Sequence, residues 1–198
     1  MGPSSAHTTI IGVRIIAGQA GGRAIAAPPA GTRPTSDRVR ESLFGILDSR
    51  VGLDGLRVLD LYAGSGALGL EAVSRGAAHA TLVESDARAA ATIAANVTAT
   101  ALPSAAFAIL RRRVEVVVGS RASAGFDVVL LDPPYALDDS AVSANLSGLI
   151  AHGWLSPDAV VVVERSARSS QTDWPAGLES YLTRTYGETR VDIATAAW

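Results

Sequence analysis

Residues 57–69 have the sequence RVLDLYAGSGALG, in which an apolar run leads into three glycines. The run has the length and character of a buried strand, and a helical pattern follows the glycines. Gly64, Gly66 and Gly69 have the G-x-G-x-x-G spacing of a turn that holds a nucleotide between a strand and a helix. Glu84 ends the next apolar run about 20 residues later, where dinucleotide-binding folds carry an acid that binds a ribose. This stretch predicts a βαβ unit with a ligand at its turn.

The chain after residue 56 alternates short apolar runs with helical patterns. The expected strands are residues 57–61, 80–84, 105–110, 128–131 and 159–164, and the expected helices lie near 67–75, 86–100 and 140–152. Buried strands that alternate with helices form a parallel sheet covered on both faces. Two more extended runs, 181–186 and 190–196, lie close enough in sequence to form a hairpin. We expect a Rossmann-like α/β fold with a mostly parallel seven-stranded sheet and an antiparallel last strand.

The amino-terminal part has a different pattern. Residues 13–27 contain two short apolar runs around three glycines, which predict a β-hairpin. Prolines interrupt the segment that follows, and Thr35 or Ser36 can cap a helix that runs to residue 49. We therefore predict a tail and β-hairpin arm over residues 1–34 and a main domain over residues 35–198.

Composition excludes several kinds of protein. The 198 residues suit one compact domain, and the absence of cysteine excludes disulfides, thiolate metal sites and cysteine nucleophiles. Three scattered histidines give no reason to expect a metal. Residues 1–9 lack the basic start and apolar core of a secretory signal, and the apolar runs are too short to cross a bilayer. We expect a cytoplasmic monomer with no membrane partner.

Positive charge is concentrated near the amino terminus. All 17 basic residues are arginines, although the formal net charge is −2. Between residues 10 and 40 five arginines face a single acid, whereas acids outnumber arginines after residue 57. Arginine makes planar, bidentate contacts with phosphate, so a basic arm of this kind suits a polyanionic partner. The candidate contacts with such a partner are Arg14, Arg23, Arg33, Arg38 and Arg40.

The glycine turn admits two kinds of ligand. In a nicotinamide dehydrogenase it would hold a pyrophosphate at the helix N-terminus. Asp60 precedes the turn, however, and its carboxylate would repel a phosphate but could hold an ammonium group. S-adenosylmethionine fits better, because it carries an ammonium, a sulfonium and a ribose but no phosphate. Glu84 would accept hydrogen bonds from the ribose hydroxyls. A hydride-transfer acid is also not evident in the sequence.

A second motif, Asp132-Pro133-Pro134-Tyr135, ends the apolar run that begins at residue 126. The prolines keep the backbone extended and leave carbonyls pointing outward. The exocyclic amine of a base is a poor nucleophile because its lone pair is delocalised into the ring. If the Asp132 carboxylate and the Pro133 carbonyl accept its two N–H groups, the nitrogen becomes more pyramidal, and Tyr135 can stack on the base. The activated methyl donor removes the need for a metal.

Together these motifs resemble the class I S-adenosylmethionine-dependent methyltransferases that modify amino groups, and more narrowly the bacterial RsmD family. Residues 14–23, 33–44 and 60–71, the tetrad and the Gly-Glu-Thr-Arg stretch at 187–190 carry the resemblance. It implies catalysis by the tetrad and a cofactor site made of Thr35, Asp60, Tyr62, Ala63, Gly64, Ser65, Gly66, Glu84 and Ser85. It also implies methylation of guanine N2 in small-subunit ribosomal RNA (16S rRNA), within a partly or fully assembled particle.

The sequence departs from the methyltransferase pattern at one place. Many such enzymes carry an acid after the third strand that binds the adenine amino group, whereas this chain has three arginines at 111–113. Adenine recognition would then depend on backbone groups. The three arginines either extend an RNA-binding surface or form an exposed helix start, and the sequence favours neither.

Other functions remain as alternatives. The first is a DNA adenine-N6 or cytosine-N4 methyltransferase, although the methyltransferase core uses almost the whole chain and leaves no second domain to recognise a duplex sequence. A glutamine methyltransferase acting on a release factor usually has Asn where this chain has Asp132. A non-catalytic RNA-binding module would explain the basic arm but not the tetrad.

Overall fold

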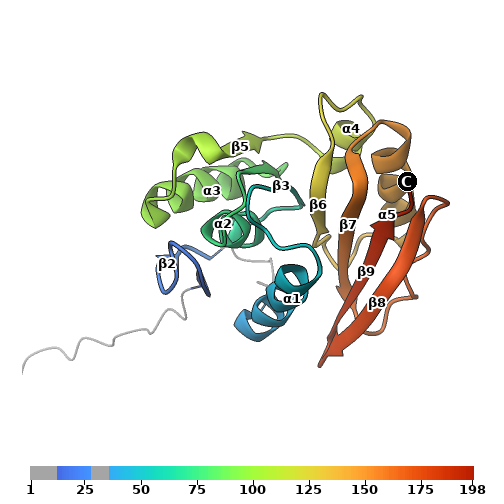
Figure 1. The fold of residues 1–198 in the computed structure, drawn as a ribbon, viewed down its shortest axis with the longest axis horizontal. Coiled ribbons are helices and arrows are strands. Elements are labelled where there is room, and N and C mark those ends of the chain that lie inside the picture. Colours follow the sequence, from blue (N-terminus) through green and yellow to red (C-terminus); the bar gives the residue numbers. More distant parts are fainter. Residues whose placement is uncertain (1–12, 28–35) are drawn as a thin grey trace, which may run out of the picture.

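A seven-stranded sheet forms the centre of the computed structural model, which describes residues 13–27 and 36–198 (Figure 1). Its strands are β3 (Arg57–Leu61), β4 (His79–Val83), β5 (Phe107–Leu110), β6 (Phe126–Leu131), β7 (Leu155–Ser166), β8 (Leu178–Tyr186) and β9 (Thr189–Ala196). They lie in the order β5-β4-β3-β6-β7-β9-β8, and β9 is antiparallel to both of its neighbours. The predicted α/β sheet with an antiparallel last strand is confirmed.

Helices cover both faces of the sheet. They are α1 (Asp37–Arg50), α2 (Ala67–Ser74), α3 (Ala87–Thr100), α4 (Val114–Val118) and α5 (Asp139–Ala151), with a 3-10 turn at Ser104–Ala106. Leu43, Leu70 and Ile93 place α1, α2 and α3 in the core on one face. Val117 and Leu146 place α4 and α5 in the core on the other. Within the described part of the chain, no helix combines the length and apolar character needed to span a bilayer.

The order of the strands positions the site. The chain continues from β3 to β4 and β5 on one side, and then crosses to β6 on the other side of β3. In open α/β sheets a crevice forms where the order reverses, outside the carboxyl ends of the strands. A ligand site is therefore expected where β3 and β6 end, which is where both sequence motifs lie.

Helix α4 and the start of β7 differ from the expected elements, whereas the start of α1 agrees with a predicted cap. Helix α4 was not among the expected helices, although a helix start at residues 111–113 was one open alternative, because its five residues, VEVVV, are β-branched except for one and span little more than one helical turn. Strand β7 begins at Leu155 rather than at residue 159, ahead of Pro157 and of Asp158 with its positive φ. Helix α1 begins after Ser36, whose Oγ accepts the Val39 N–H at 3.3 Å.

The predicted hairpin is present as β1 (Val13–Arg14) and β2 (Ala24–Ile25), and it packs against the sheet domain. Val13 and Ile25 belong to the same core as α1, α2 and α3. Gly18 has a φ of +79°, and a Cβ there would lie 1.8 Å from the Ser74 carbonyl oxygen at the end of α2. The hairpin therefore fits directly onto this helix. The division of the chain at residue 34 stays a prediction.

A buried carboxylate fastens the hairpin. Glu71 of α2 accepts the N–H groups of Ile16 at 2.6 Å and Ala17 at 3.1 Å. It also forms an ion pair with Arg75 Nε at 2.6 Å. Its side chain is fully buried, so these three donors replace the water that the carboxylate loses on folding.

We expect Glu71→Ala to destabilise the protein by about 3–5 kcal/mol, because the change leaves Arg75 partly buried without this partner and two backbone donors unsatisfied. Urea unfolding measures the loss. Glu71→Gln, which keeps one acceptor oxygen, is expected to lose less. Hydrogen exchange at Ile16 and Ala17 should accelerate in both variants; unchanged protection there would contradict the assigned role.

Candidate active site

A cavity of about 580 Å³ opens at the carboxyl ends of β3, β4, β6 and β7. Most of the predicted site residues line it: Asp60, Tyr62, Ala63, Gly64, Ser65, Glu84, Ser85, Asp132, Pro133, Pro134 and Tyr135. The structure thus brings the glycine turn and the tetrad to one cavity. Gly66 is not among the lining residues, and Thr35 lies outside the described residues.

Four carboxylates line this cavity: those of Asp60, Glu84, Asp132 and Glu164. Among its lining residues that the structure describes, none is an arginine, lysine or histidine. Such a cavity disfavours phosphates and favours ligands with cationic groups or hydrogen-bond donors. A pyrophosphate ligand, as in a nicotinamide dehydrogenase, is therefore the poorer match.

Asp60 lies at the centre of this arrangement and is 1% exposed. Its Oδ2 accepts the Gly69 N–H at 2.9 Å, whereas the buried Oδ1 has no hydrogen-bond partner among the described residues. Burial raises the pKa of Asp60 to about 7, despite the Gly69 hydrogen bond, and the negative charges of Asp132 and Glu84 add to the increase. An unpartnered, buried acceptor of this kind fits the ammonium group of S-adenosylmethionine.

Glu84 holds the glycine turn in place. Its Oε2 accepts the Gly64 N–H at 2.9 Å, and its Oε1 accepts the Asp86 N–H at 2.8 Å. Each carboxylate oxygen has a second lone pair, so Glu84 can still accept ribose hydroxyls from the cavity. The side chain therefore fits the role that the sequence predicts while it also shapes the turn.

Gly66 has a packing role. It starts α2 with a φ of +80°, and a Cβ there would lie 3.0 Å from Leu82 Cδ2. A Cβ on Gly69 would lie 2.9 Å from the same Leu82 atom. Both glycines thus let α2 approach β4 closely. A contact between Gly66 and the cofactor stays a prediction.

Tyr62 leaves β3 in a conformation that is rare for a non-glycine residue, with a φ of +64°. Asn145 of α5 donates a hydrogen bond to its hydroxyl at 2.8 Å. Burial raises the pKa of Tyr62. The ring is thereby fixed to the α5 side of the sheet while the residue still lines the cavity.

The tetrad leaves β6 as a tight turn. The Asp132 N–H reaches the Leu61 carbonyl of β3 at 3.4 Å, and the Pro134 carbonyl accepts the Leu137 N–H at 2.8 Å. Tyr135 is 43% exposed, and its hydroxyl lies 3.4 Å from Thr189 Oγ1. The Pro134 carbonyl is engaged in the turn, so the Pro133 carbonyl is the candidate acceptor beside Asp132. Tyr135 offers an exposed ring for stacking.

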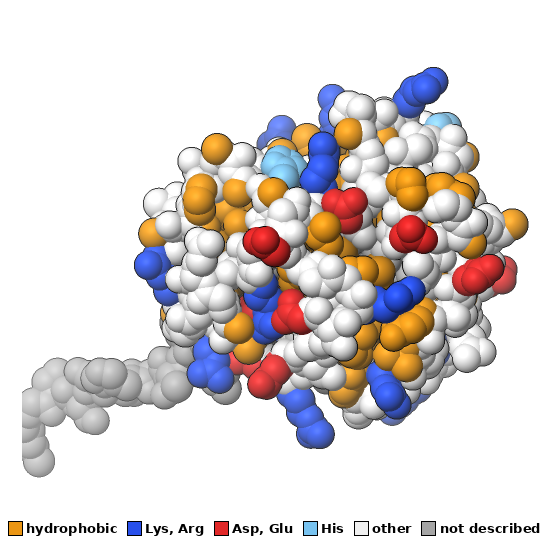
Figure 2. Space-filling model, in the orientation of Figure 1, with side chains coloured by type: hydrophobic (Ala, Val, Ile, Leu, Met, Phe, Trp, Pro, Cys, Tyr) orange, Lys and Arg blue, Asp and Glu red, His pale blue; other side chains and the backbone are white. Residues whose placement is uncertain are grey.

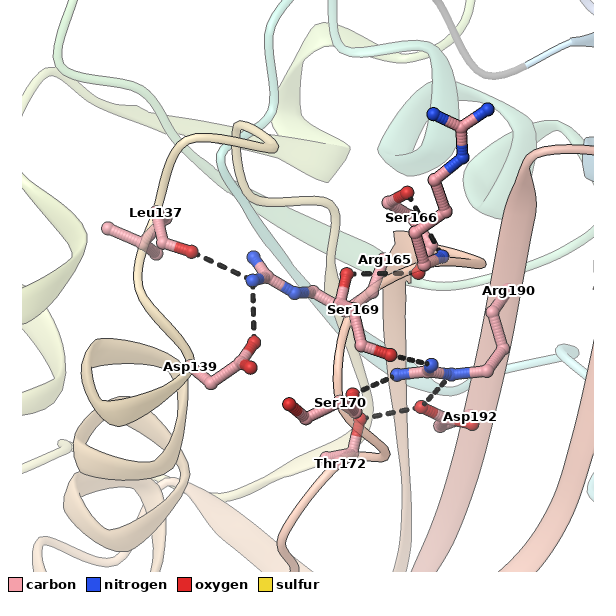
Figure 3. A network of polar contacts seen from close by, with 10 residues as sticks. Leu137, Asp139, Arg165, Ser166, Ser169, Ser170, Thr172, Arg190 and Asp192 are labelled. Carbon is pink, nitrogen blue, oxygen red and sulfur yellow. Dashed lines mark hydrogen bonds and ion pairs between the residues drawn. The ribbon is translucent and has the colours of Figure 1, made fainter.

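Two buried arginines, Arg165 of β7 and Arg190 of β9, bind the segments around the tetrad (Figure 3). Arg165 of β7 donates through Nη2 to the Leu137 carbonyl at 2.8 Å and to Asp139 Oδ1 at 2.7 Å. Hydrogen bonding from Ser170, followed by Arg165, lowers the pKa of Asp139. The turn after the tetrad is thus tied to β7.

Arg190 of β9 holds the loop that follows β7. It donates to the Ser169 carbonyl at 2.7 Å and the Ser170 carbonyl at 2.5 Å, and it pairs with Asp192 Oδ2 at 2.9 Å (Figure 3). Apart from Asp192, which lies two residues along the same strand, these partners come from separate segments and could not be identified from sequence spacing. Charged residues on a buried strand were the one available signal.

The five arginines predicted to contact RNA do not share one environment. Arg14 and Arg38 are exposed, Arg23 donates to the Thr100 carbonyl, and Arg33 lies outside the described residues. Arg40 is 0% exposed and donates to Asp37 and the Arg14 carbonyl. The prediction that Arg40 contacts RNA is therefore wrong, because its guanidinium is inaccessible. Figure 2 shows one face of the molecule, where basic side chains are scattered among acidic ones.

The three arginines at 111–113 are exposed and lie between β5 and α4. Arg113 is the N-cap residue of α4 and pairs with Glu115. The exposed-helix-start interpretation is thus confirmed for Arg113. An RNA contact by these arginines stays a prediction.

Glu164 is the site residue that the sequence analysis missed. It is 5% exposed and follows the buried run Val160–Val163 of β7. A signal was available, since an acid lies within two residues of the carboxyl end of each of the strands β3, β4, β6 and β7.

Comparisons with known proteins agree with this geometry. A family model described as Conserved hypothetical protein 95 matches residues 13–195. The ribosomal RNA small subunit methyltransferase D of Escherichia coli K12 is 36% identical over 184 residues, which cover 89% of this chain and 86% of that protein. The YlbH protein of Bacillus subtilis is 34% identical, covering 91% of this chain and 97% of that protein.

A solved structure also resembles this chain closely. The yhhF protein of Escherichia coli superposes with a TM-score of 0.81 at 29% identity, over 93% of this chain and 98% of that one. The family match spans nearly all of the described residues, including both strand-end motifs. The chain therefore belongs to the Conserved hypothetical protein 95 family, which is the RsmD family of methyltransferases that its motifs indicate.

Proposed function

We propose that this protein transfers a methyl group from S-adenosylmethionine to the exocyclic N2 of one guanine in 16S rRNA. The observation that carries the proposal is the shared cavity, in which Asp60 and Glu84 lie on one side and the tetrad lies at the neighbouring strand end. Relatives with this family's sequence pattern are named as small-subunit ribosomal RNA methyltransferases. Nothing in the cavity favours the DNA-modifying alternative.

The residues of the cavity divide into two groups. Asp60 would hold the cofactor's ammonium group and Glu84 its ribose, and the glycine turn would bring the backbone close to both. Bound S-adenosylmethionine supplies a methyl group activated by its sulfonium. Asp132 and the Pro133 carbonyl would accept the two N–H groups of the guanine amine and orient its lone pair toward the cofactor side. Tyr135 would hold the plane of the base, provided that the base is unstacked or flipped out.

The decisive experiment is methyl transfer from radiolabelled S-adenosylmethionine to purified small subunits that lack the modification. We expect label in 16S rRNA, at a single guanine after nuclease mapping, and N2-methylguanosine after digestion to nucleosides. Free 16S rRNA and duplex DNA serve as parallel substrates. Label in adenine or cytosine of DNA, or no transfer to any particle or RNA, would contradict the proposed function.

The setting of the reaction is part of the proposal. A relative is named as a small-subunit ribosomal RNA methyltransferase. From this we infer that the substrate is an assembling or assembled particle in the cytoplasm. The enzyme would act as a monomer. A higher rate on particles than on free RNA, and a monomeric mass in solution, support this setting.

We expect Arg38→Gln to weaken RNA binding and to reduce the slope of log affinity against log salt concentration by about one. Arg38 is exposed on the first turn of α1, next to Ser36 and Val39 of the cavity wall. Arg121→Gln is the matched control, because Arg121 is exposed near the amino end of β6. Binding measured by filter retention at several salt concentrations tests this; an equal slope for Arg38→Gln and the unchanged protein would reject the phosphate contact.

A further inference from the structure

We propose that Glu164 selects guanine, by accepting the N1–H that lies beside the amine to be methylated. This inference rests on the proposed function and extends it from the reaction to the choice of base. It assigns a role to a buried carboxylate that the methyl-transfer chemistry does not otherwise use.

The register of the sheet places Glu164 beside Asp132. Leu131 of β6 pairs with Val163 of β7 in the last rung of that parallel ladder. Asp132 and Glu164 are the next residues along the two strands, and parallel strands lie about 4.8 Å apart. Because side chains alternate between the faces of a sheet, both carboxylates point to the face that carries Leu130 and Val162. Both residues line the cavity.

Glu164 lines the cavity although it is largely buried. Its exposed fraction is 5%, and it belongs to the same cavity lining as Asp132. A carboxylate oxygen has two lone pairs, so in addition to its contacts within the protein Glu164 can accept a hydrogen bond from a ligand in the cavity. The neighbouring Thr189 and Tyr186 also line this part of the cavity, and neither carries a positive charge.

The chemistry of the bases then identifies the ligand. The guanine amine is bonded to a ring carbon whose neighbour N1 carries a hydrogen. In adenine and cytosine the ring nitrogen next to the amine has a lone pair and no hydrogen. An acceptor beside Asp132 therefore attracts guanine, whereas it repels both other aminated bases. Asp132 and the Pro133 carbonyl would accept the two N–H groups of the amine, and Glu164 would accept the N1–H at the adjacent ring position.

The test compares two bases at the target position. Small subunits are reconstituted with 16S rRNA that carries either guanine or 2-aminopurine at the mapped nucleotide. The analogue has the same 2-amino group but no hydrogen on N1. We expect the unchanged protein to methylate the analogue about 100-fold less efficiently in kcat/KM, because the lone pair of N1 then faces a carboxylate.

The variant Glu164→Gln isolates the contact. An amide can donate to the bare N1 of the analogue, so the 100-fold preference should fall to about tenfold or less. Glu179→Gln makes the same chemical change at an exposed position of β8 outside the cavity, and it should leave the preference intact. Calorimetry with S-adenosylmethionine verifies that each variant is folded.

Two outcomes would overturn the inference. The first is equal methylation of guanine and 2-aminopurine by the unchanged protein, a result that requires no variant and holds even if Glu164→Gln does not fold. The second is a Glu164→Gln protein that loses activity on both bases by the same factor. A failure of methylation on the guanine particle itself would instead refute the proposed function.

Discussion

Replacing Asp132 with alanine is expected to lower kcat about a thousandfold and to leave S-adenosylmethionine binding nearly unchanged. The carboxylate lies at the strand end beside the cofactor side of the cavity, where it would accept one N–H of the target amine. Without it the nitrogen lone pair stays delocalised into the ring, and the amine loses one of its two orienting contacts. Single-turnover methyl transfer measures the effect on chemistry apart from product release.

Two variants sharpen this expectation. Asp132→Asn keeps an acceptor oxygen but removes the charge, so its kcat should lie between the values for alanine and for the unchanged protein. Asp54→Ala alters an exposed aspartate in the loop before β3 and should leave turnover intact. Normal turnover in Asp132→Ala would refute the catalytic assignment. Loss of cofactor affinity equal to the loss of turnover would show that Asp132 acts in binding instead.

Asp60→Asn is expected to stabilise the cofactor-free protein at high pH and to weaken cofactor binding at least tenfold. Burial raises the pKa of Asp60 to about 7 from 3.8. The folded protein therefore binds more protons than the unfolded chain between these values, and its stability falls as the pH rises through that range. The cost of the ionised carboxylate above pH 7 is about 4 kcal/mol.

The asparagine variant removes this penalty while its amide oxygen can still accept the Gly69 N–H. Urea unfolding at pH 5 and pH 8 should show a gain of stability at both values and a clearly larger gain at pH 8, because the penalty builds up between pH 3.8 and about 7. In the unchanged protein, cofactor affinity should increase as the pH rises through about 7, because the ammonium group binds the ionised form. Calorimetry in buffers of different ionisation enthalpy would detect the released proton. Equal stability changes at both pH values would contradict the buried-charge explanation.

Most of the strands, and the two motifs that form much of the site, could be predicted from local sequence patterns. The strands were predictable because each is a short apolar run between helical segments, and the two motifs lie at strand ends that a parallel sheet brings together. Asp60, Glu84 and Asp132 follow from this rule. Glu164 obeys the same rule, but its strand contains no motif to attract notice.

The errors have a physical origin in packing. Arg40 was assigned to the RNA surface by its charge, although it lies three and four positions before Leu43 and Phe44 on the buried face of α1. The charge of a side chain follows from its residue type alone, whereas its burial depends on which face of the helix packs against the core. The same limit applies to Arg165 and Arg190, because most of their partners come from segments that sequence spacing does not place beside them.

The contact between the hairpin and α2 links the two amino-terminal strands to the sheet domain. Helix α2 begins at the glycine turn and binds the hairpin through Glu71 and Ser74. Deleting the hairpin would expose an apolar surface and leave the Glu71 carboxylate without two of its donors. We therefore expect the hairpin and the sheet domain to unfold together, so that a chain shortened to its catalytic motifs would be less stable.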